Sequence, residues 1–291
     1  MYVVAGVTGH IGSVVAEELL GRGTQVRVIV RTEAQAEAWR VKRAKVVVGR
    51  LEDTGFLASA LRGATGAFLL LPPNPAAADL PAWQRSVVDS IASACARSTL
   101  GHAVILSSVG AQHAEGTGPI AALHLLEQRA RVAAAQVTVL RPCSFMENLL
   151  AVLPVAVQKG VLPTMIAGDA PMAMIATRDI GKLAAERLID PPDANAIYEL
   201  AGPEYRMSQV AALLSRLLQK PIAVAHVPPE AQATALEEAG MGASTAAALS
   251  EMYRAAQSGR LTFEGGKAQL VRARTALEHL LPEWVARFAN R

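Results

Sequence analysis

The chain has 291 residues, of which 52% are hydrophobic, 18% charged and 4% aromatic, and its net charge is +3 at pH 7. Such a composition is far too apolar for a disordered protein, and the length suits one large domain or a large domain with a smaller partner. The longest apolar runs have the length of strands, so we expect no transmembrane helix and no membrane association.

The cysteine content and the first residues bear on the location of the protein. Two cysteines, Cys95 and Cys143, are too few for a disulfide framework. No basic flank followed by a long apolar segment opens the chain, so we expect no signal peptide and a cytoplasmic, reducing location. The densest basic stretch, residues 40–45, has no interleaved aromatic residues. This favours a solvated helix end over a nucleic-acid surface, and we expect no nucleic-acid partner.

The first half of the chain alternates between buried strands and helices. Apolar, β-branched runs predict strands at Tyr2–Val7, Gln25–Val30, Lys45–Val48, Ala67–Leu71, Ala103–Leu106 and Val137–Leu140. Apolar residues at helical spacing predict helices at Ile11–Leu20, Glu33–Trp39, Phe56–Leu61, Ala82–Arg97 and Ile120–Ala134. This alternation implies βαβ units, and the near-continuous apolar strands suit a parallel sheet buried on both faces.

After Pro142 this rhythm changes. Helices are predicted at Thr177–Ile189 and Ser208–Leu218, and short strands at Ile197–Ala201 and Ile222–Val227. The remainder is expected to be mostly helical, with glycine breaks. The second half therefore predicts a smaller, mainly helical unit, with part of the chain returning to the large sheet.

The strongest site signal is the segment Gly6-Val7-Thr8-Gly9-His10-Ile11-Gly12, which connects the first strand to the first helix. That context is typical of a dinucleotide-binding motif, with the spacing GxxGxxG in place of GxGxxG. Gly6 permits a tight turn, Gly9 lets the backbone approach a pyrophosphate, and Gly12 lets the helix pack closely on the strand. The helix N-terminus offers unpaired N–H groups to the phosphates. A glycine-rich turn without a ligand is the alternative. The expected cofactor contacts here are Gly6, Thr8, Gly9, His10, Ile11 and Gly12.

The end of the second strand bears on which nucleotide binds. An NAD site usually places an acidic residue there for the ribose 2′-OH, whereas this chain has Arg31. A guanidinium favours a 2′-phosphate, so NADP(H) is favoured and NAD(H) stays open. An ordinary surface arginine at a strand end is the alternative.

Further cofactor contacts are expected at the carboxyl ends of the other strands, because ligands bind outside those ends in open α/β sheets. The candidates are Leu51, Leu71, Pro72, Ser107, Ser108, Val109, Pro142, Cys143, Ser144 and Phe145. We therefore expect an α/β fold with a Rossmann-like doubly wound parallel sheet and a smaller, mainly helical C-terminal domain. The NAD(P)-binding domain is expected over residues 1–150, with 175–201 returning to it, and the smaller substrate-binding domain mainly over 151–291.

By these residues the chain resembles the NmrA-like proteins, an atypical group of short-chain dehydrogenases/reductases. The segments that carry the resemblance are Gly6–Gly12, Val26–Arg31, Ile105–Ser108, Glu127, Leu140–Pro142 with Phe145, Glu147 and Asn148, Asp179-Ile180, Tyr198–Pro203 and Arg274–Phe288. The resemblance implies a small C-terminal domain over the nicotinamide. The family includes NADPH-dependent quinone reductases, triphenylmethane dye reductases, plant phenylpropanoid reductases and cofactor-sensing regulators without turnover. The resemblance therefore implies cofactor binding more firmly than it implies any particular reaction.

The chain departs from the catalytic pattern of the wider superfamily, which is Tyr-xxx-Lys just past the fifth strand with a nearby Ser. Its tyrosines stand at positions 2, 198, 205 and 253, and no lysine lies between Lys45 and Lys159. The lysine that some relatives carry in the helix holding Leu123 and His124 is also absent. Ketone reduction or sugar-nucleotide epimerisation by the usual route is therefore not expected.

Hydride transfer to a quinone or a cationic dye needs no strong enzymic acid, because positioning in a dry pocket suffices. His124 is the remaining local acid/base candidate, and Ser107 and Ser108 are candidates to bond the nicotinamide or polarise a substrate oxygen. A helix-surface histidine and strand-ending serines are the alternatives. No two histidines have metal-ligand spacing, so no metal site is expected. Candidates for the lining of the substrate pocket, each also a candidate core residue, are Phe145, Met146, Leu149, Met165 and Met172.

These observations favour an NADPH-dependent oxidoreductase that transfers hydride to a small, planar, apolar acceptor, either quinone-like or another electron-poor aromatic. A non-catalytic NADP(H)-sensing protein that binds a protein partner is the alternative. The helices predicted at Ala82–Arg97 and Ile120–Ala134 resemble dimer-forming helices of the wider superfamily, which favours a homodimer.

Overall fold

The computed structural model describes residues 1–167 and 169–289. Its largest feature is an eight-stranded sheet in the order β13-β10-β6-β5-β4-β1-β2-β3, in which all neighbouring strands are parallel. Its strands are β1 (Tyr2–Val4), β2 (Val26–Val30), β3 (Lys45–Val48), β4 (Gly66–Leu70), β5 (His102–Leu106), β6 (Gln136–Pro142), β10 (Ala196–Ala201) and β13 (Gln269–Arg272). The strand order reverses between β1 and β4, as in a doubly wound fold, so the expected fold class is confirmed.

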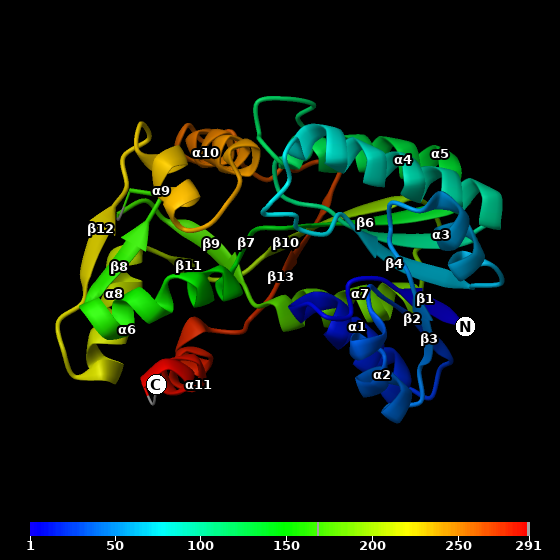
Figure 1. Ribbon diagram of the computed structural model, residues 1–291, viewed down its shortest axis with the longest axis horizontal. Coiled ribbons are helices and arrows are strands. Elements are labelled where there is room, and N and C mark those ends of the chain that lie inside the picture. Colours follow the sequence, from blue (N-terminus) through cyan, green and yellow to red (C-terminus); the bar gives the residue numbers. More distant parts are fainter. Residues whose placement is uncertain (168, 290–291) are drawn as a thin grey trace.

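Helices cover both faces of this sheet (Figure 1). One face carries α1 (His10–Gly21), α2 (Glu37–Val41) and α7 (Thr177–Ile189), and the other carries α3 (Thr54–Leu61), α4 (Leu80–Ser98) and α5 (Ile120–Ala133). Successive side chains of β4 point to opposite faces of the sheet. Phe68 packs in the apolar core on the face that α1 covers, and Leu69 packs in the core on the face that α3 covers. The expected helix Glu33–Trp39 is instead a 3-10 turn, η1 (Glu33–Gln35), followed by α2.

The remaining elements form a smaller unit beside the carboxyl edge of the sheet (Figure 1). Its strands are β7 (Ser144–Phe145), β8 (Val161–Thr164), β9 (Met172–Ile175), β11 (Glu204–Tyr205) and β12 (Ala223–His226). Its helical segments are η2 (Met146–Ala151), α6 (Leu153–Lys159), α8 (Met207–Leu218), α9 (Gln232–Glu238), α10 (Ala243–Gln257), η3 (Leu277–His279) and α11 (Leu281–Ala289). A separate apolar core, which includes Leu153, Leu214 and Leu281, holds this unit together.

The chain returns to the large sheet twice. The first return, α7 and β10, lies within residues 175–201, where a return was expected. The second, β13, lies in a segment expected to be mostly helical. Three of its four residues are exposed, so no buried apolar run announces it. Pairing with β10 holds the segment in strand conformation, with Tyr198 opposite Gln269 and Ala201 opposite Arg272. Among the described helices none is both long and apolar enough to cross a bilayer.

Candidate active site

The turn between β1 and α1 has the geometry that its glycines predict. Gly6 has φ +69°, a conformation that favours glycine, and its carbonyl accepts a 2.9 Å hydrogen bond from the Gly9 amide. A Cβ on Gly12 would lie 2.4 Å from the Gly6 oxygen and 2.7 Å from the Ala5 oxygen. Only glycine therefore lets the helix start this close to the strand.

The N-terminus of α1 is open. Its N-cap is Gly9, which supplies no side-chain hydrogen bond, whereas Asp53 caps α3 and Asp79 caps α4 through their carboxylates. Gly9 and His10 are exposed, and a Cβ on Gly9 would meet only one backbone oxygen, at 3.4 Å. Unpaired N–H groups and the positive end of a 12-residue helix thus face open space, which fits the pyrophosphate of a dinucleotide. The other expected contacts of the turn lie beside them, Thr8 exposed and Ile11 buried.

Two arginines follow the adjoining ends of β2 and β3. Val30 pairs with Val48, and the Gly49 amide donates a 2.9 Å hydrogen bond to the Val30 carbonyl. Arg31 and Arg50, which come next on the two strands, are exposed and form no ion pair with a described residue. Both cations are therefore available to an anionic group at the end of β2. Sequence reasoning missed Arg50, although its position past a strand end was a usable signal.

The candidates at the other strand ends differ in exposure. Leu51 is buried in the core, and Leu71, Pro72, Ser144 and Phe145 are half-buried. Pro142 and Cys143 are buried, and their backbone is engaged: Val109 donates to the Pro142 carbonyl at 3.0 Å and Cys143 donates to the Leu200 carbonyl at 2.9 Å. Burial raises the pKa of the Cys143 thiol to about 11, so this thiol is protonated at neutral pH.

Ser107 belongs to a buried ionic cluster. It is 3% exposed, and its hydroxyl donates to Glu127 Oε1 at 2.5 Å. Arg141 binds the same carboxylate through both oxygens, from Nε at 2.9 Å and from Nη2 at 2.7 Å. The neighbouring Ser108 is half-buried and donates to the Val109 carbonyl at 3.0 Å. The Ser107 hydroxyl is thus already committed to Glu127, which favours a positioning role for it over direct contact with substrate.

The cluster extends to the loop that leads into β13. Arg141 Nη1 donates to Glu264 Oε2 at 2.6 Å, and the Glu264 and Gly265 amides donate to the buried carboxylate of Glu199 at 2.5 and 3.2 Å. Burial lowers the pKa of Arg141, but its hydrogen bonds and charge pairing with Glu127 and Glu264 outweigh this and raise the pKa above its ordinary value. Sequence reasoning did not find this cluster, since it joins residues far apart in the chain.

His124 lies on α5 and faces the loop after β5. It is half-buried, and its Nδ1 lies 2.8 Å from the Ala111 carbonyl oxygen. A carbonyl only accepts, so Nδ1 carries a proton and Nε2 is the basic nitrogen of the neutral ring. The side chain is therefore held in one tautomer beside the carboxyl end of β5.

The five candidates for the substrate pocket separate into two groups. Met146 and Leu149 are buried in the core of the smaller unit, so their side chains mainly stabilise it. Phe145, Met165 and Met172 are half-buried. Phe145 packs against the core on the α1 side of the sheet and Met172 against the core of the smaller unit, so only the exposed parts of these side chains and of Met165 can line a site between the units.

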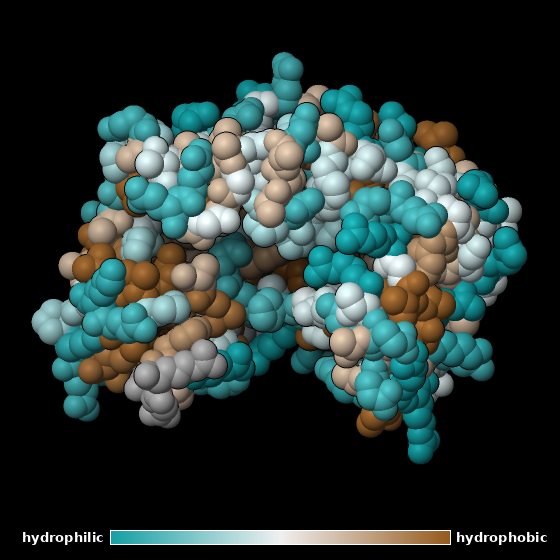
Figure 2. All heavy atoms as spheres, viewed as in Figure 1, coloured by the Kyte–Doolittle hydropathy of each residue, from teal (hydrophilic) through white to brown (hydrophobic). Residues whose placement is uncertain are grey.

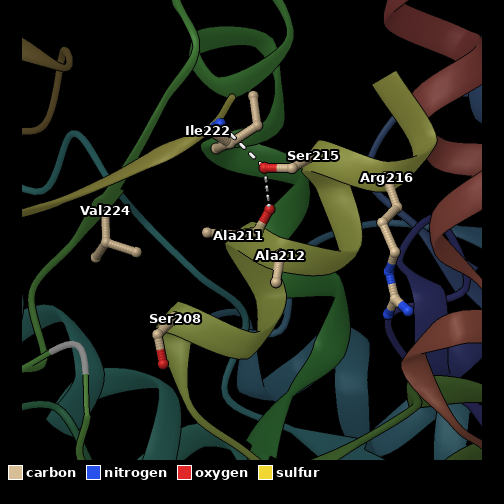
Figure 3. Close-up of a pocket in the computed structure, with 7 residues that line it drawn as sticks. All are labelled: Ser208, Ala211, Ala212, Ser215, Arg216, Ile222 and Val224. Carbon is tan, nitrogen blue, oxygen red and sulfur yellow. Dashed lines mark hydrogen bonds between the residues drawn. The ribbon is translucent and has the colours of Figure 1, made fainter. Parts of the chain in front are cut away.

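The face shown in Figure 2 is hollowed between the two units, and apolar residues lie in its depth. Two surface cavities are also present among the described residues. One, of about 230 Å³, lies between α7, β10 and β13, and the other, of about 700 Å³, is an open groove on α8 and β12 (Figure 3). In that groove Ser215 donates to the Ala211 carbonyl and accepts from the Ile222 amide, so its hydrogen bonds are made within the protein. Neither cavity is lined by a residue that the sequence assigned to the site.

No group of three or more His, Cys, Asp or Glu side chains within residues 1–167 and 169–289 is arranged to hold a metal ion.

The candidate site consists of the open N-terminus of α1, the arginines Arg31 and Arg50, and the residues around the carboxyl ends of β4, β5 and β6.

Comparisons with known proteins agree with this architecture. The model of the NmrA-like family matches residues 2–265. An NAD(P)H azoreductase of Xenophilus azovorans is 27% identical over 254 residues, which cover 87% of this chain and 86% of that protein. A (4-alkanoyl-5-oxo-2,5-dihydrofuran-3-yl)methyl phosphate reductase of Streptomyces griseus is 29% identical over 238 residues, covering 81% and 80% of the two chains. The structure of an NADPH-dependent quinone oxidoreductase of Escherichia coli in complex with NADPH has a TM-score of 0.78 at 24% identity and covers 99% of each chain.

Proposed function

Because the chain belongs to the NmrA-like family, we propose that it is an NADPH-dependent reductase that passes hydride to a quinone-like or other electron-poor aromatic acceptor. The observation that carries the proposal is the open N-terminus of α1 together with Arg31 at the end of β2. A helix start without a side-chain cap and a guanidinium that forms no ion pair with any described residue offer two anion sites on one edge of the sheet.

Each part of the cofactor has residues that fit it. The first amides of α1, which follow Gly9, would bind the pyrophosphate, and Arg31, with Arg50 beside it, would bind the 2′-phosphate. The nicotinamide would then extend along the carboxyl edge toward Ser108 and Phe145. When bound, NADPH supplies the hydride.

The acceptor class follows from chemistry that the site lacks and from the relatives. The sequence has no Tyr-xxx-Lys pair to protonate a ketone. The names of the relatives specify an azo compound, an oxo-dihydrofuran and a quinone, all of which are conjugated and electron-poor. Such acceptors take up hydride without strong acid assistance, and the proton that completes their reduction comes from water or from His124. The protein contributes orientation and a dry apolar site.

A turnover panel tests the proposal. Purified protein is mixed with NADPH and, in turn, a simple quinone, an azo dye and a cationic triphenylmethane dye, and loss of NADPH absorbance is followed. We expect oxidation with at least one acceptor. Tight NADPH binding without oxidation across the panel would instead favour a cofactor-sensing regulatory protein, which the absence of the Tyr-xxx-Lys pair also allows.

Assembly and location belong to the same proposal. The helices α4 and α5 pack against each other on one face of the large sheet, and they are the helices through which we expect a homodimer. A mass of two chains in sedimentation equilibrium is the expected result. A cytoplasmic location, where NADPH is available, is tested by fractionation of the source cells.

A further inference from the structure

Helix α10 lies across the loops that follow β4 and β5. On the first loop, the Thr245 hydroxyl donates to the Asn74 carbonyl at 3.2 Å. On the second loop, Gly118 approaches the helix so closely that a Cβ there would lie 2.1 Å from the Ala248 oxygen. The helix therefore rests on the two loops that border the carboxyl edge of the sheet, above β7, β9 and β10 in Figure 1.

The other side of α10 is tied to the smaller unit. Gln257 Nε2 donates to the Met165 carbonyl at 2.6 Å, and Gln232 Nε2 on α9 donates to the same oxygen at 2.9 Å. Met165 is one of the residues expected to line the substrate pocket. Helix α10 thus bridges the loops of the large unit and the Met165 segment of the smaller one.

The phase of this helix places Tyr253 on its inner side. Ala247 and Arg254 are exposed and mark the outer face. Tyr253 is half-buried and lies on the same stripe of the helix as the buried residues Ala246 and Ser250, away from that outer face. Gln257, which is exposed at the end of the helix, reaches the Met165 carbonyl, and Tyr253 lies one turn before it, next to the Met165 segment.

The surroundings of Tyr253 leave both its ring and its hydroxyl available. The residue is half-buried, yet among the described residues it belongs neither to the two cores that flank the large sheet nor to the core of the smaller unit. Its hydroxyl makes no hydrogen bond within the part of the chain that the structure describes. Burial raises the pKa of Tyr253, so the hydroxyl stays protonated at neutral pH and remains a donor. By contrast, the hydroxyl of Tyr205 is fully engaged with Leu277 and Glu278.

We propose that Tyr253, which lies on α10 of the smaller unit, is an acceptor-binding residue of the reductase site. Its ring lies against the planar acceptor, and its hydroxyl donates a hydrogen bond to the acceptor oxygen or nitrogen that gains negative charge as hydride arrives. The proposal rests on the proposed function and deepens it. It places a phenolic donor at the acceptor although no tyrosine lies near β5 in the sequence.

The test separates the hydroxyl from the ring. Tyr253→Phe keeps the ring, and we expect it to lower kcat for a simple quinone about tenfold while NADPH affinity stays unchanged, because the donor acts mainly on the charge that develops during reduction. Tyr253→Leu also removes the stacking surface, so it should raise the KM for the quinone as well. Tyr2→Phe is the matched control, since Tyr2 opens β1 at the opposite edge of the sheet, and it should behave as the wild type.

The outcomes distinguish this proposal from the proposed function. If the wild type reduces the quinone and Tyr253→Phe and Tyr253→Leu do so equally well, Tyr253 has no role at the acceptor and the reductase function stands. If the wild type reduces no acceptor, the proposed function fails, and binding of 1,4-naphthoquinone to the protein, followed by tryptophan fluorescence, decides on Tyr253. Weaker binding by Tyr253→Leu would support the site, and equal or undetectable binding in both proteins would overturn it.

Discussion

Glu127 and Arg141 form a buried, bidentate ion pair near the carboxyl edge of the large sheet. Arg141 Nε and Nη2 bind the two oxygens of Glu127 at 2.9 and 2.7 Å, and the side chains are only 1% and 4% exposed. The pair joins α5 to β6 and, through Glu264, holds the loop before β13. It therefore supports three segments that border the candidate site.

Removing one member of this pair should destabilise the protein strongly. Glu127→Gln leaves the Arg141 guanidinium buried with one of its charge partners lost, and we expect the free energy of unfolding to fall by about 3–5 kcal/mol. Urea unfolding followed by circular dichroism measures the change.

A surface pair provides the matched control for that substitution. Glu283 pairs with Arg287 on α11, where both side chains are more than half exposed. Glu283→Gln should therefore alter the stability by less than about 1 kcal/mol. Equal effects of Glu127→Gln and Glu283→Gln would contradict the assigned importance of the buried pair.

Two glycines of the β1–α1 turn should respond differently to alanine. A methyl group at Gly12 would collide with the Gly6 and Ala5 backbone, so Gly12→Ala should cost about 1–3 kcal/mol of stability. Gly9 has φ −101° and a Cβ there would contact only the Gly6 oxygen, at 3.4 Å, so Gly9→Ala should fold as the wild type does. In Gly9→Ala the methyl group would obstruct the pyrophosphate instead, and the Kd for NADPH should rise about tenfold or more. Thermal unfolding and fluorescence titration measure the two effects, and unchanged NADPH affinity in Gly9→Ala would argue against the phosphate site.

Arg31 should determine the preference for NADPH over NADH. Removing its guanidinium by Arg31→Ala deletes charge-assisted hydrogen bonds to the 2′-phosphate, so the Kd for NADPH should rise about 10- to 100-fold while that for NADH barely changes. Arg50→Ala should produce a smaller loss. Arg62→Ala, an exposed arginine that follows α3, is the control. Equal affinity of the wild type for the two nucleotides would remove the basis for this assignment.

His102 should make the protein less stable in mild acid. It is 5% exposed, its Nε2 lies 3.0 Å from the Thr138 hydroxyl, and its Nδ1 is buried without a hydrogen-bond partner among the described residues. Burial lowers its pKa from 6.5 to about 4. Between these two pH values the unfolded chain binds a proton at His102 that the folded protein does not. The contribution of His102 to the free energy of unfolding is therefore fully present above about pH 6.5 and is lost as the pH drops toward 4. The full loss is on the order of 3 kcal/mol.

Urea unfolding between pH 8 and pH 4 checks this dependence. His102→Gln cannot take up a proton in this range, so the fall in stability should become shallower by about the contribution of one group. His226→Gln, at an exposed position in β12, should keep the slope of the wild type. A slope that is the same in the wild type and in His102→Gln would show that other groups govern acid stability.

Local signals in the sequence predicted most of the large sheet and the start of the site. The run of strands and helices up to β6 follows from apolar periodicity, and the glycine spacing predicts a turn whose close contacts at Gly12 the structure shows. The segment Phe145–Asn148, which carried much of the resemblance, has a structural role as well. Glu147 accepts hydrogen bonds from the Thr177 amide at 3.0 and 3.1 Å and so caps α7.

What the sequence did not reveal depends on contacts between distant segments. β13 is an exposed edge strand that exists by pairing with β10, and Arg141 meets Glu264 across more than a hundred residues. The position of Tyr253 depends on α10 folding back over the loops after β4 and β5. None of these contacts leaves a periodic pattern, since each is set by tertiary packing rather than by local preference.

The most direct test of the account is NADPH oxidation by the wild type and by Gly9→Ala with a simple quinone as acceptor. We predict steady oxidation of NADPH by the wild type and, at the same NADPH concentration below its Kd, at least tenfold slower oxidation by a folded Gly9→Ala protein. No oxidation by a wild type that binds NADPH tightly would contradict the proposed reductase, and equal rates in the two proteins would contradict the assigned cofactor site.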